Sequence, residues 1–344
     1  MAANYFCVDF SETNIKIADI NKSGNMFDAT VFGSTAAEPL YFTTDTEKVQ
    51  ENQANYLKSL IDKLKITKKN VGIVIPDTYT YSQIMEMPKL NEKELISAIK
   101  YQADQLIPMP IDKTNIDIEI IHEDDVNKKL LVLMVAAPKS LIAKVQNTVE
   151  SIGLIPEFIE NELSSSSRLL SQLFTNVDPK QTTNNIIFLN LSFNSSSLYF
   201  FNSKLNAVTQ IYNFNIGTNL FLKEIQINLN IDLIKAIEVL TTYDISHTTS
   251  YPIETIIAPV VKEFTFELNR FISLINQKYQ LTINGVYLLN EATKFPALCK
   301  IIEKNYNIPT TLANSYNFFK KSTIVETYKN ELPLYVSTIG GNLR

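Results

Sequence analysis

The chain has 344 residues, 45% of them hydrophobic and 19% charged, which predicts about two domains with cores of their own. A formal net charge of −5, with no run of lysines or arginines longer than a pair, argues against a nucleic-acid partner. Two cysteines and two histidines are too few for a disulfide framework or a zinc centre.

The N-terminal part opens on a predicted strand–turn–strand unit. Residues 4–10 and 14–20 alternate with a period of two around a Ser-Glu-Thr-Asn turn, as paired strands do. A further strand near 26–32, a helix over 47–64 and a short buried strand at 71–75 follow. This order indicates α/β architecture.

The next stretch predicts a separate α/β subdomain. Asn91 can cap a helix that Pro108 stops, and we expect its apolar residues Leu95, Ile99 and Leu106 to form the subdomain core. Strands at 116–121 and 130–136, a helix over 141–152 closed by Gly153, and a helix over 164–174 come next.

After a polar joint at 178–183, the opening pattern recurs. Residues 186–191 and 197–201 again give strand, turn and strand, and a third strand spans 207–214. Helices are predicted at 219–228, 231–241, 252–278 and 296–305, with a strand at 286–289. Periodicity alone leaves open any α/β protein that contains two hairpins.

The most informative stretch of sequence runs from Met85 to Leu170. It contains, in this order, a charged helix, a Pro-x-Pro sequence that stops it, paired strands ending in Ala-Ala-Pro-Lys, a second helix and a Gly-x-x-Pro turn. The chain closes with LPLYVSTIGGNLR. Both segments resemble the type IV pilus assembly PilM family of the actin-like superfamily, which is related to FtsA. The resemblance implies an α/β, actin-like (ribonuclease H-like, duplicated) two-lobed fold, with lobes at 1–178 and 179–344 and an α/β subdomain inserted at about 82–153.

The first phosphate motif of that family, Val-Asp-Ile-Gly-Ser-x-Ser-x-Lys, corresponds here to VDFSETNIK. Asp9 would hold Mg²⁺ through water, and Lys16 would meet the β- and γ-phosphates. Ser11 replaces the glycine, and Glu12 brings a carboxylate into the turn. Without the resemblance, Glu12 would be a solvated loop residue and Lys16 a surface lysine. The nucleotide contacts implied in this turn are Asp9, Ser11, Thr13, Asn14 and Lys16.

The second phosphate motif departs further from the family. Asn190 stands where the family has Asp, and Ser192 where it has Gly, so the site loses a charge that attracts Mg²⁺. Ser195 lies in the same turn, which is otherwise a plain β-turn rich in Asn and Ser. The implied contacts here are Asn190, Ser192 and Ser195.

The adenosine motif should contain paired glycines, and the chain has Asn290 and Glu291 instead. Gly217 and Thr218 retain the family's glycine turn after the third strand. With only 8 glycines in the chain, Asn is the best remaining residue for positive φ, which suggests that Asn replaced some family glycines.

Glu160 matches a family acidic position at the cleft and is the second predicted metal residue beside Asp9. The alternative is that Glu160 and Glu162 are ordinary residues at a strand-to-helix junction, with Glu162 favoured near a helix N-terminus.

The resemblance implies ATP and Mg²⁺ as ligands, but the missing glycines and the Asn190 substitution favour a scaffold with an eroded site over an enzyme. Such a scaffold would bind the cytoplasmic tail of a PilN-like inner-membrane protein and connect to the assembly ATPase. The implied groove lies near 84–87, 91–107 and 139–152. With neither a signal peptide nor a membrane span, the protein is expected in the cytoplasm, held at the inner face of the cytoplasmic membrane through partners.

Two other functions are weighed against that scaffold. One is an active, Mg-ATP-dependent actin-like switch in pilus assembly or, as in FtsA, cell division; the other is a small-molecule kinase of the same superfamily. An FtsA-like membrane helix is not expected at the C-terminus, because Ile339-Gly340-Gly341-Asn342 is a poor helix former.

Overall fold

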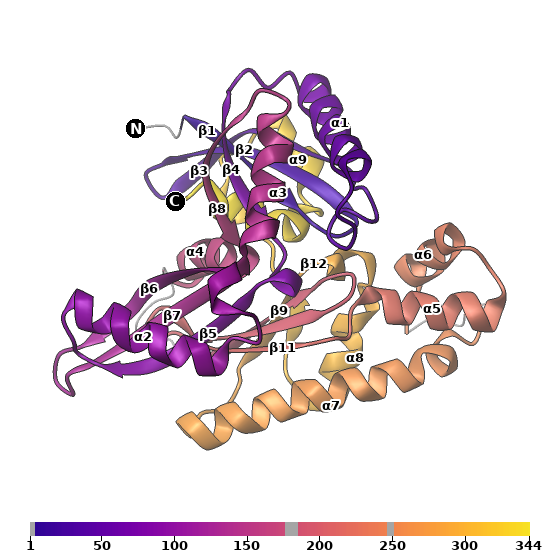
Figure 1. The fold of residues 1–344 in the computed structure, drawn as a ribbon. Helices are drawn as coiled ribbons and strands as arrows, with labels where there is room; N and C mark the ends of the chain where they lie inside the picture. The colour runs from indigo at the N-terminus through magenta and orange to yellow at the C-terminus, as the bar shows by residue number, and fades with distance from the viewer. Residues whose placement is uncertain (1–3, 176–184, 246–250) are drawn as a thin grey trace. The chain divides into compact units, whose positions relative to one another are not determined.

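The computed structural model describes residues 4–175, 185–245 and 251–344 (Figure 1). The chain forms two compact units. Unit 1 comprises Met1–Leu173, Phe318–Glu326 and Ser337–Arg344, and unit 2 comprises Phe174–Asn317 and Thr327–Val336. The predicted polar joint at 178–183, with the predicted domain boundary inside it, lies outside the described residues.

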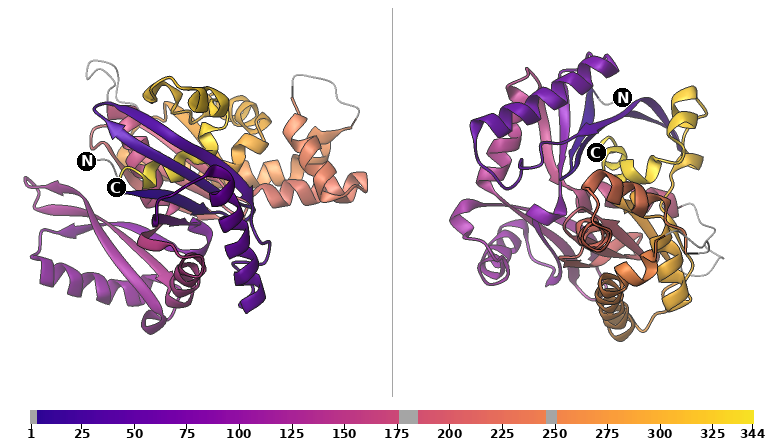
Figure 2. Two further views of the ribbon diagram at one scale, coloured as in Figure 1. Left: turned by 90° about the horizontal axis from the view of Figure 1, so that it is seen from above. Right: turned by 90° about the vertical axis from the view of Figure 1, so that its right-hand side faces the viewer.

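Unit 1 is built on a five-stranded sheet in the order β3-β2-β1-β4-β8. Its strands are β1 (Tyr5–Phe10), β2 (Asn14–Ser23), β3 (Met26–Ala36), β4 (Asn70–Ile75) and β8 (Ile155–Asn161). Its helices are α1 (Glu47–Leu64) and α3 (Lys139–Glu150). It also contains most of α4 (Glu162–Thr175), α9 (Thr323–Tyr328) and α10 (Val336–Gly341), each of which extends by one or two residues into unit 2. Helices α1 and α3 contact each other, and both contribute buried side chains to one hydrophobic core with the sheet. Figures 1 and 2 show the course of the sheet strands and these helices as ribbons.

The predicted inserted subdomain has the sheet order β5-β7-β6 and a single long helix. Its elements are β5 (Tyr81–Pro88), α2 (Glu92–Leu106), β6 (Thr114–Asp124) and β7 (Lys129–Pro138). Asn91 and Glu94 form a capping box at the start of α2. Leu95 and Ile99 are buried in the subdomain core as expected. The prediction for Leu106 is wrong: it is 42% exposed, because α2 ends there and Ile107 turns inward instead.

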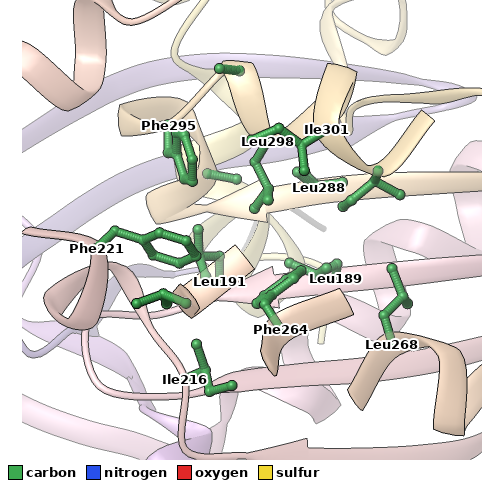
Figure 3. Packing of buried hydrophobic residues seen from close by; sticks show 14 of the residues in the cluster. Leu189, Leu191, Ile216, Phe221, Phe264, Leu268, Leu288, Phe295, Leu298 and Ile301 are labelled. Carbon is green, nitrogen blue, oxygen red and sulfur yellow. The ribbon is translucent and has the colours of Figure 1, made fainter. Parts of the chain in front are cut away.

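Unit 2 repeats the arrangement with the order β11-β10-β9-β12-β13. Its strands are β9 (Asn185–Leu191), β10 (Ser196–Asn202), β11 (Ala207–Phe214), β12 (Gly285–Asn290) and β13 (Thr310–Leu312). Its helices are α5 (Thr218–Leu229), α6 (Leu233–Thr242), α7 (Ile253–Tyr279) and α8 (Ala297–Tyr306). Figure 3 shows part of the core, where Phe221 and Phe264 from the helices meet Leu191 and Leu288 from the strands.

The two large sheets have the same topology. In each, three antiparallel strands (β1–β3 and β9–β11) are followed by two parallel ones. The predicted recurrence of the strand–turn–strand unit is therefore confirmed. It places Asp9 on β1 and Asn190 on β9 at corresponding positions, one in each unit.

One premise of the C-terminal prediction, that 339–342 is a poor helix former, is overruled locally, although no FtsA-like membrane helix forms from this six-residue segment. Residues 336–341 form the short helix α10 despite Gly340 and Gly341. Glycine is needed there because a Cβ on Gly340 would lie 1.9 Å from the carbonyl oxygen of Ser165. Tertiary packing thus outweighs low helix propensity.

Candidate functional site

A buried ion pair lies at the end of β1. Asp9 and Lys16 are paired in register across β1 and β2, with Lys16 Nζ 2.7 Å from Asp9 Oδ2 and neither side chain exposed. The hydroxyl of Ser11 donates to Asp9 Oδ1 across 3.1 Å, and the hydroxyl of Ser337 donates to Asp9 Oδ2. The Asp9 carboxylate therefore has a cation and two hydroxyl donors from its own chain, and Lys16 is not a surface lysine.

The turn between β1 and β2 is held closed by the backbone. Ser11 N donates to Asn14 O at 2.9 Å, and Ala37 N donates to Thr13 O at 3.1 Å. Glu12 is only 9% exposed, so the solvated-loop alternative is wrong. The Tyr79 hydroxyl donates to Glu12 Oε1 across 3.1 Å, and burial, together with the Glu12 charge, raises the pKa of Tyr79 well above its usual range.

Glu162 interacts electrostatically with both members of this ion pair, and it is hydrogen-bonded to Asp77. Glu162, the first residue of α4, is fully buried and accepts from the backbone N–H of Asp77 at 3.2 Å. Burial and the charges of Asp9 and Asp77 raise the pKa of Glu162 to about 8, against the opposing effect of Lys16. Asp77 in turn accepts from Leu163 N at 3.0 Å, which satisfies an N–H of the first turn of α4. The sequence analysis did not predict a role for Asp77. Its position directly after a buried strand and Pro76 could have indicated a functional residue at the strand end.

Glu160, the second predicted metal residue, lies on β8 and forms ion pairs with Arg168 and Arg344. Burial raises the pKa of Glu160, and the two arginines oppose that shift. The charge of Asp9 contributes to the raised pKa of Glu162 and is not among the causes of the Glu160 shift. A metal role for Asp9 with Glu160 stays a prediction.

In unit 2, an amide pair occupies the ends of β9 and β12. Asn290 Nδ2 donates to Asn190 Oδ1 at 3.2 Å, and Asn190 Nδ2 donates to the Tyr199 hydroxyl at 3.1 Å. Asn290 has φ 62° and ψ −126°, a conformation that glycine adopts more readily than other residues. Glu291 is buried and its carboxylate lies 2.7 Å from Lys294 Nζ. The predicted residues at 190 and 290 thus meet in one neutral network.

The Ser192–Ser195 turn closes onto the start of α5. Thr218 N donates to Ser192 O at 3.1 Å, and Asn219 N donates to Phe193 O at 2.8 Å. Ser192 N also donates to Ser195 O at 3.0 Å. A Cβ on Gly217 would lie 2.3 Å from the Phe193 carbonyl oxygen, so glycine is required for this close approach. The structure therefore brings Ser192 and Ser195 together with Gly217 and Thr218.

The duplicated units define a class: the fold is the α/β actin-like ATPase fold with two ribonuclease H-like lobes. A solved structure described as "PilM-PilN type IV pilus biogenesis complex" matches with a TM-score of 0.85 and 19% identity over 100% of this chain and 99% of that one. The ethanolamine utilization protein EutJ from Carboxydothermus hydrogenoformans matches with a TM-score of 0.55 and 10% identity over 98% of this chain and 89% of that one.

The family model "Type IV pilus assembly protein PilM" matches residues 7–344. The chain belongs to this family. In the part of the chain that the structure describes, no helix combines the length and apolar character needed to cross a membrane.

The side chains of these two sites, as arranged, do not fit the Mg²⁺-bound nucleotide that this fold implies. Asp9 is neutralised by Lys16, and the Asn190 amide is uncharged. The first N–H groups of α5, which are the donors that a helix offers a phosphate, bind the carbonyls of Ser192 and Phe193. Among the described residues, no group of three or more Asp, Glu, His or Cys is arranged to hold a metal ion.

Proposed function

We propose that this protein is a scaffold of a type IV pilus assembly machine that binds the cytoplasmic tail of a PilN-like inner-membrane protein. The observation that carries the proposal is the match over the whole chain, at a TM-score of 0.85, to a structure described as a PilM-PilN complex. Membership of the PilM family over residues 7–344 supports it. The protein works in the cytoplasm, and its partner holds it at the membrane.

The inserted subdomain supplies a suitable surface for an extended tail. Strand β5 lies at one edge of its sheet, since the sheet order is β5-β7-β6. An extended peptide can add to such an edge through main-chain hydrogen bonds and place alternate side chains in pockets. We therefore propose that the groove lies along β5, α2 and α3.

The nucleotide site is degenerate in this proposal, and binding of the tail does not require ATP. The buried Asp9–Lys16 pair and the neutral Asn190–Asn290 pair support this part. Hydrolysis by this fold requires a cation held by free carboxylates and a preorganised phosphate cradle. No observation specifically favours the ATPase switch, the FtsA-like role or the kinase.

The test is a titration of the purified full chain with a fluorescent peptide that carries the cytoplasmic tail of a PilN-like protein from the same organism. A scrambled peptide is the control, and each titration is run with Mg²⁺-ATP and with EDTA. Saturable, sequence-dependent binding of equal affinity in both conditions is expected, with slower hydrogen exchange in 81–106 and 139–150 and no change in α7. Failure of the native tail to bind better than the scrambled one would refute the scaffold. A strict requirement for Mg²⁺-ATP would favour the switch.

A further inference from the structure

The C-terminal segment 337–344 returns to unit 1, and its first residue is Ser337. The hydroxyl of Ser337 donates to Asp9 Oδ2, the same carboxylate oxygen that Lys16 Nζ approaches to 2.7 Å. All three residues are at most 5% exposed. The Asp9 carboxylate, which the sequence predicts to hold a metal, thus holds the start of this segment through Ser337.

The rest of the segment is fastened to the same strands. Asn342 Oδ1 accepts from Ile20 N at 3.2 Å, and its Nδ2 donates to Ala18 O at 3.0 Å. The Tyr5 hydroxyl donates to Gly341 O at 3.1 Å. Strands β1 and β2 therefore contact the segment along its length, in addition to the Asp9 contact at its start.

The close packing leaves little room for the segment to shift. A Cβ on Gly340 would lie 1.9 Å from Ser165 O, and one on Gly341 would lie 2.3 Å from Cys7 Sγ. A metal ion at Asp9 would compete with both Lys16 and Ser337 for the same carboxylate oxygen. Ligand binding would then act against the docking of the segment.

We propose that Asp9, paired with Lys16, anchors the C-terminal segment through Ser337 and does not serve as a metal ligand in this chain. The inference rests on the degenerate nucleotide site proposed above, and it is independent of the proposed tail partner. A hydrogen bond to a charged acceptor inside a protein is stronger than one between neutral groups. The single hydrogen bond from Ser337 to Asp9 therefore contributes measurably to holding the segment in place.

The experiment is hydrogen–deuterium exchange on the full chain with Ser337→Ala, in the absence of any tail peptide. Loss of a hydrogen bond to a charged group should speed exchange of the 338–344 amides by about tenfold or more. The matched control is Ser166→Ala, because Ser166 is a fully buried serine of the same unit whose hydroxyl has no hydrogen-bond partner. Equal exchange of 338–344 in the two variants overturns the proposal.

A second measurement keeps the test decisive if Ser337→Ala does not fold. Wild-type protein is compared with EDTA and with millimolar Mg²⁺-ATP, and exchange of residues 5–16 and 338–344 is expected to be the same in both. If Mg²⁺-ATP slows exchange at 5–16 and speeds it at 338–344, Asp9 is a ligand residue and the anchor role is wrong. Neither arm uses the PilN-like peptide, so failure of the proposed partner leaves these results intact.

Discussion

Asn290 Nδ2 donates to Asn190 Oδ1 across 3.2 Å, so two side-chain amides meet at the ends of β9 and β12. Both residues are at most 4% exposed, and Asn190 is also bonded to Tyr199. The amide pair carries no charge, and the two hydrogen bonds connect β9, β10 and β12 within unit 2.

Restoring the family carboxylate with Asn190→Asp is expected to destabilise the protein by about 1–3 kcal/mol at pH 8, because it buries a charge without a paired cation. Burial raises the pKa of such a carboxyl, so the loss should shrink as the pH falls and the group takes up a proton. Urea unfolding at pH 5 and pH 8 measures both effects. Asn194→Asp, on an exposed residue of the same turn, is the control and should cost little. Micromolar Mg²⁺-ATP binding by Asn190→Asp would show that the site lacks only that charge.

Lys16→Met is expected to cost about 3–5 kcal/mol in the free energy of unfolding, since it leaves Asp9 charged and buried without its cation. Lys68→Met is a matched control: Lys68 Nζ also lies 2.7 Å from an aspartate, Asp19, but the lysine side chain is 26% exposed. A partly exposed pair of this kind contributes about 1 kcal/mol or less. Urea unfolding of both variants gives the comparison, and similar losses would contradict a special role for the buried pair.

The stability of the protein should fall as the pH rises through the range set by Glu162. Its pKa is raised from 4.5 to about 8 by burial and by Asp9 and Asp77, so between these values the folded state holds a proton that the unfolded state releases. The resulting slope is at most about 1.4 kcal/mol per pH unit. Glu162→Gln should remove it while keeping an acceptor for the Asp77 N–H. Unfolding is followed from pH 5 to 8, with exposed Glu51→Gln as the control; an unchanged slope in Glu162→Gln would refute the assignment.

Much of the fold follows from local patterns, because the spacing of apolar residues is set by burial on one face. The helix predicted over 47–64 is α1 (Glu47–Leu64), and the recurrence of strand, turn and strand predicted the duplicated sheets. The capping residue Asn91 was also predictable from sequence. The positions of Asp9 and Lys16 opposite one another follow from a two-residue period on either side of a turn.

Contacts between distant residues were not predictable from those patterns. Ser337 lies 328 positions from Asp9, and Tyr79 lies 67 from Glu12, so no local spacing reveals either hydrogen bond. The raised pKa of Glu162 depends in part on Asp77, which comes from another element. Leu106 fits the helical period but is exposed, because the helix ends before the core does. The helical period shows which face of the helix is apolar, but it does not show how far along the helix that face is packed against the core.

Gly340→Ala tests whether close packing explains the glycine in α10. The added Cβ would lie 1.9 Å from Ser165 O, a backbone atom that cannot move aside alone, so a loss of about 2 kcal/mol or more is expected. Gly24→Ala is the comparison: its Cβ would meet nothing within 4 Å, and its cost of about 1 kcal/mol comes only from φ +63°. Urea unfolding gives both values. If Gly340→Ala costs no more than Gly24→Ala, α10 and α4 can separate readily, and the segment is not held by packing at this point.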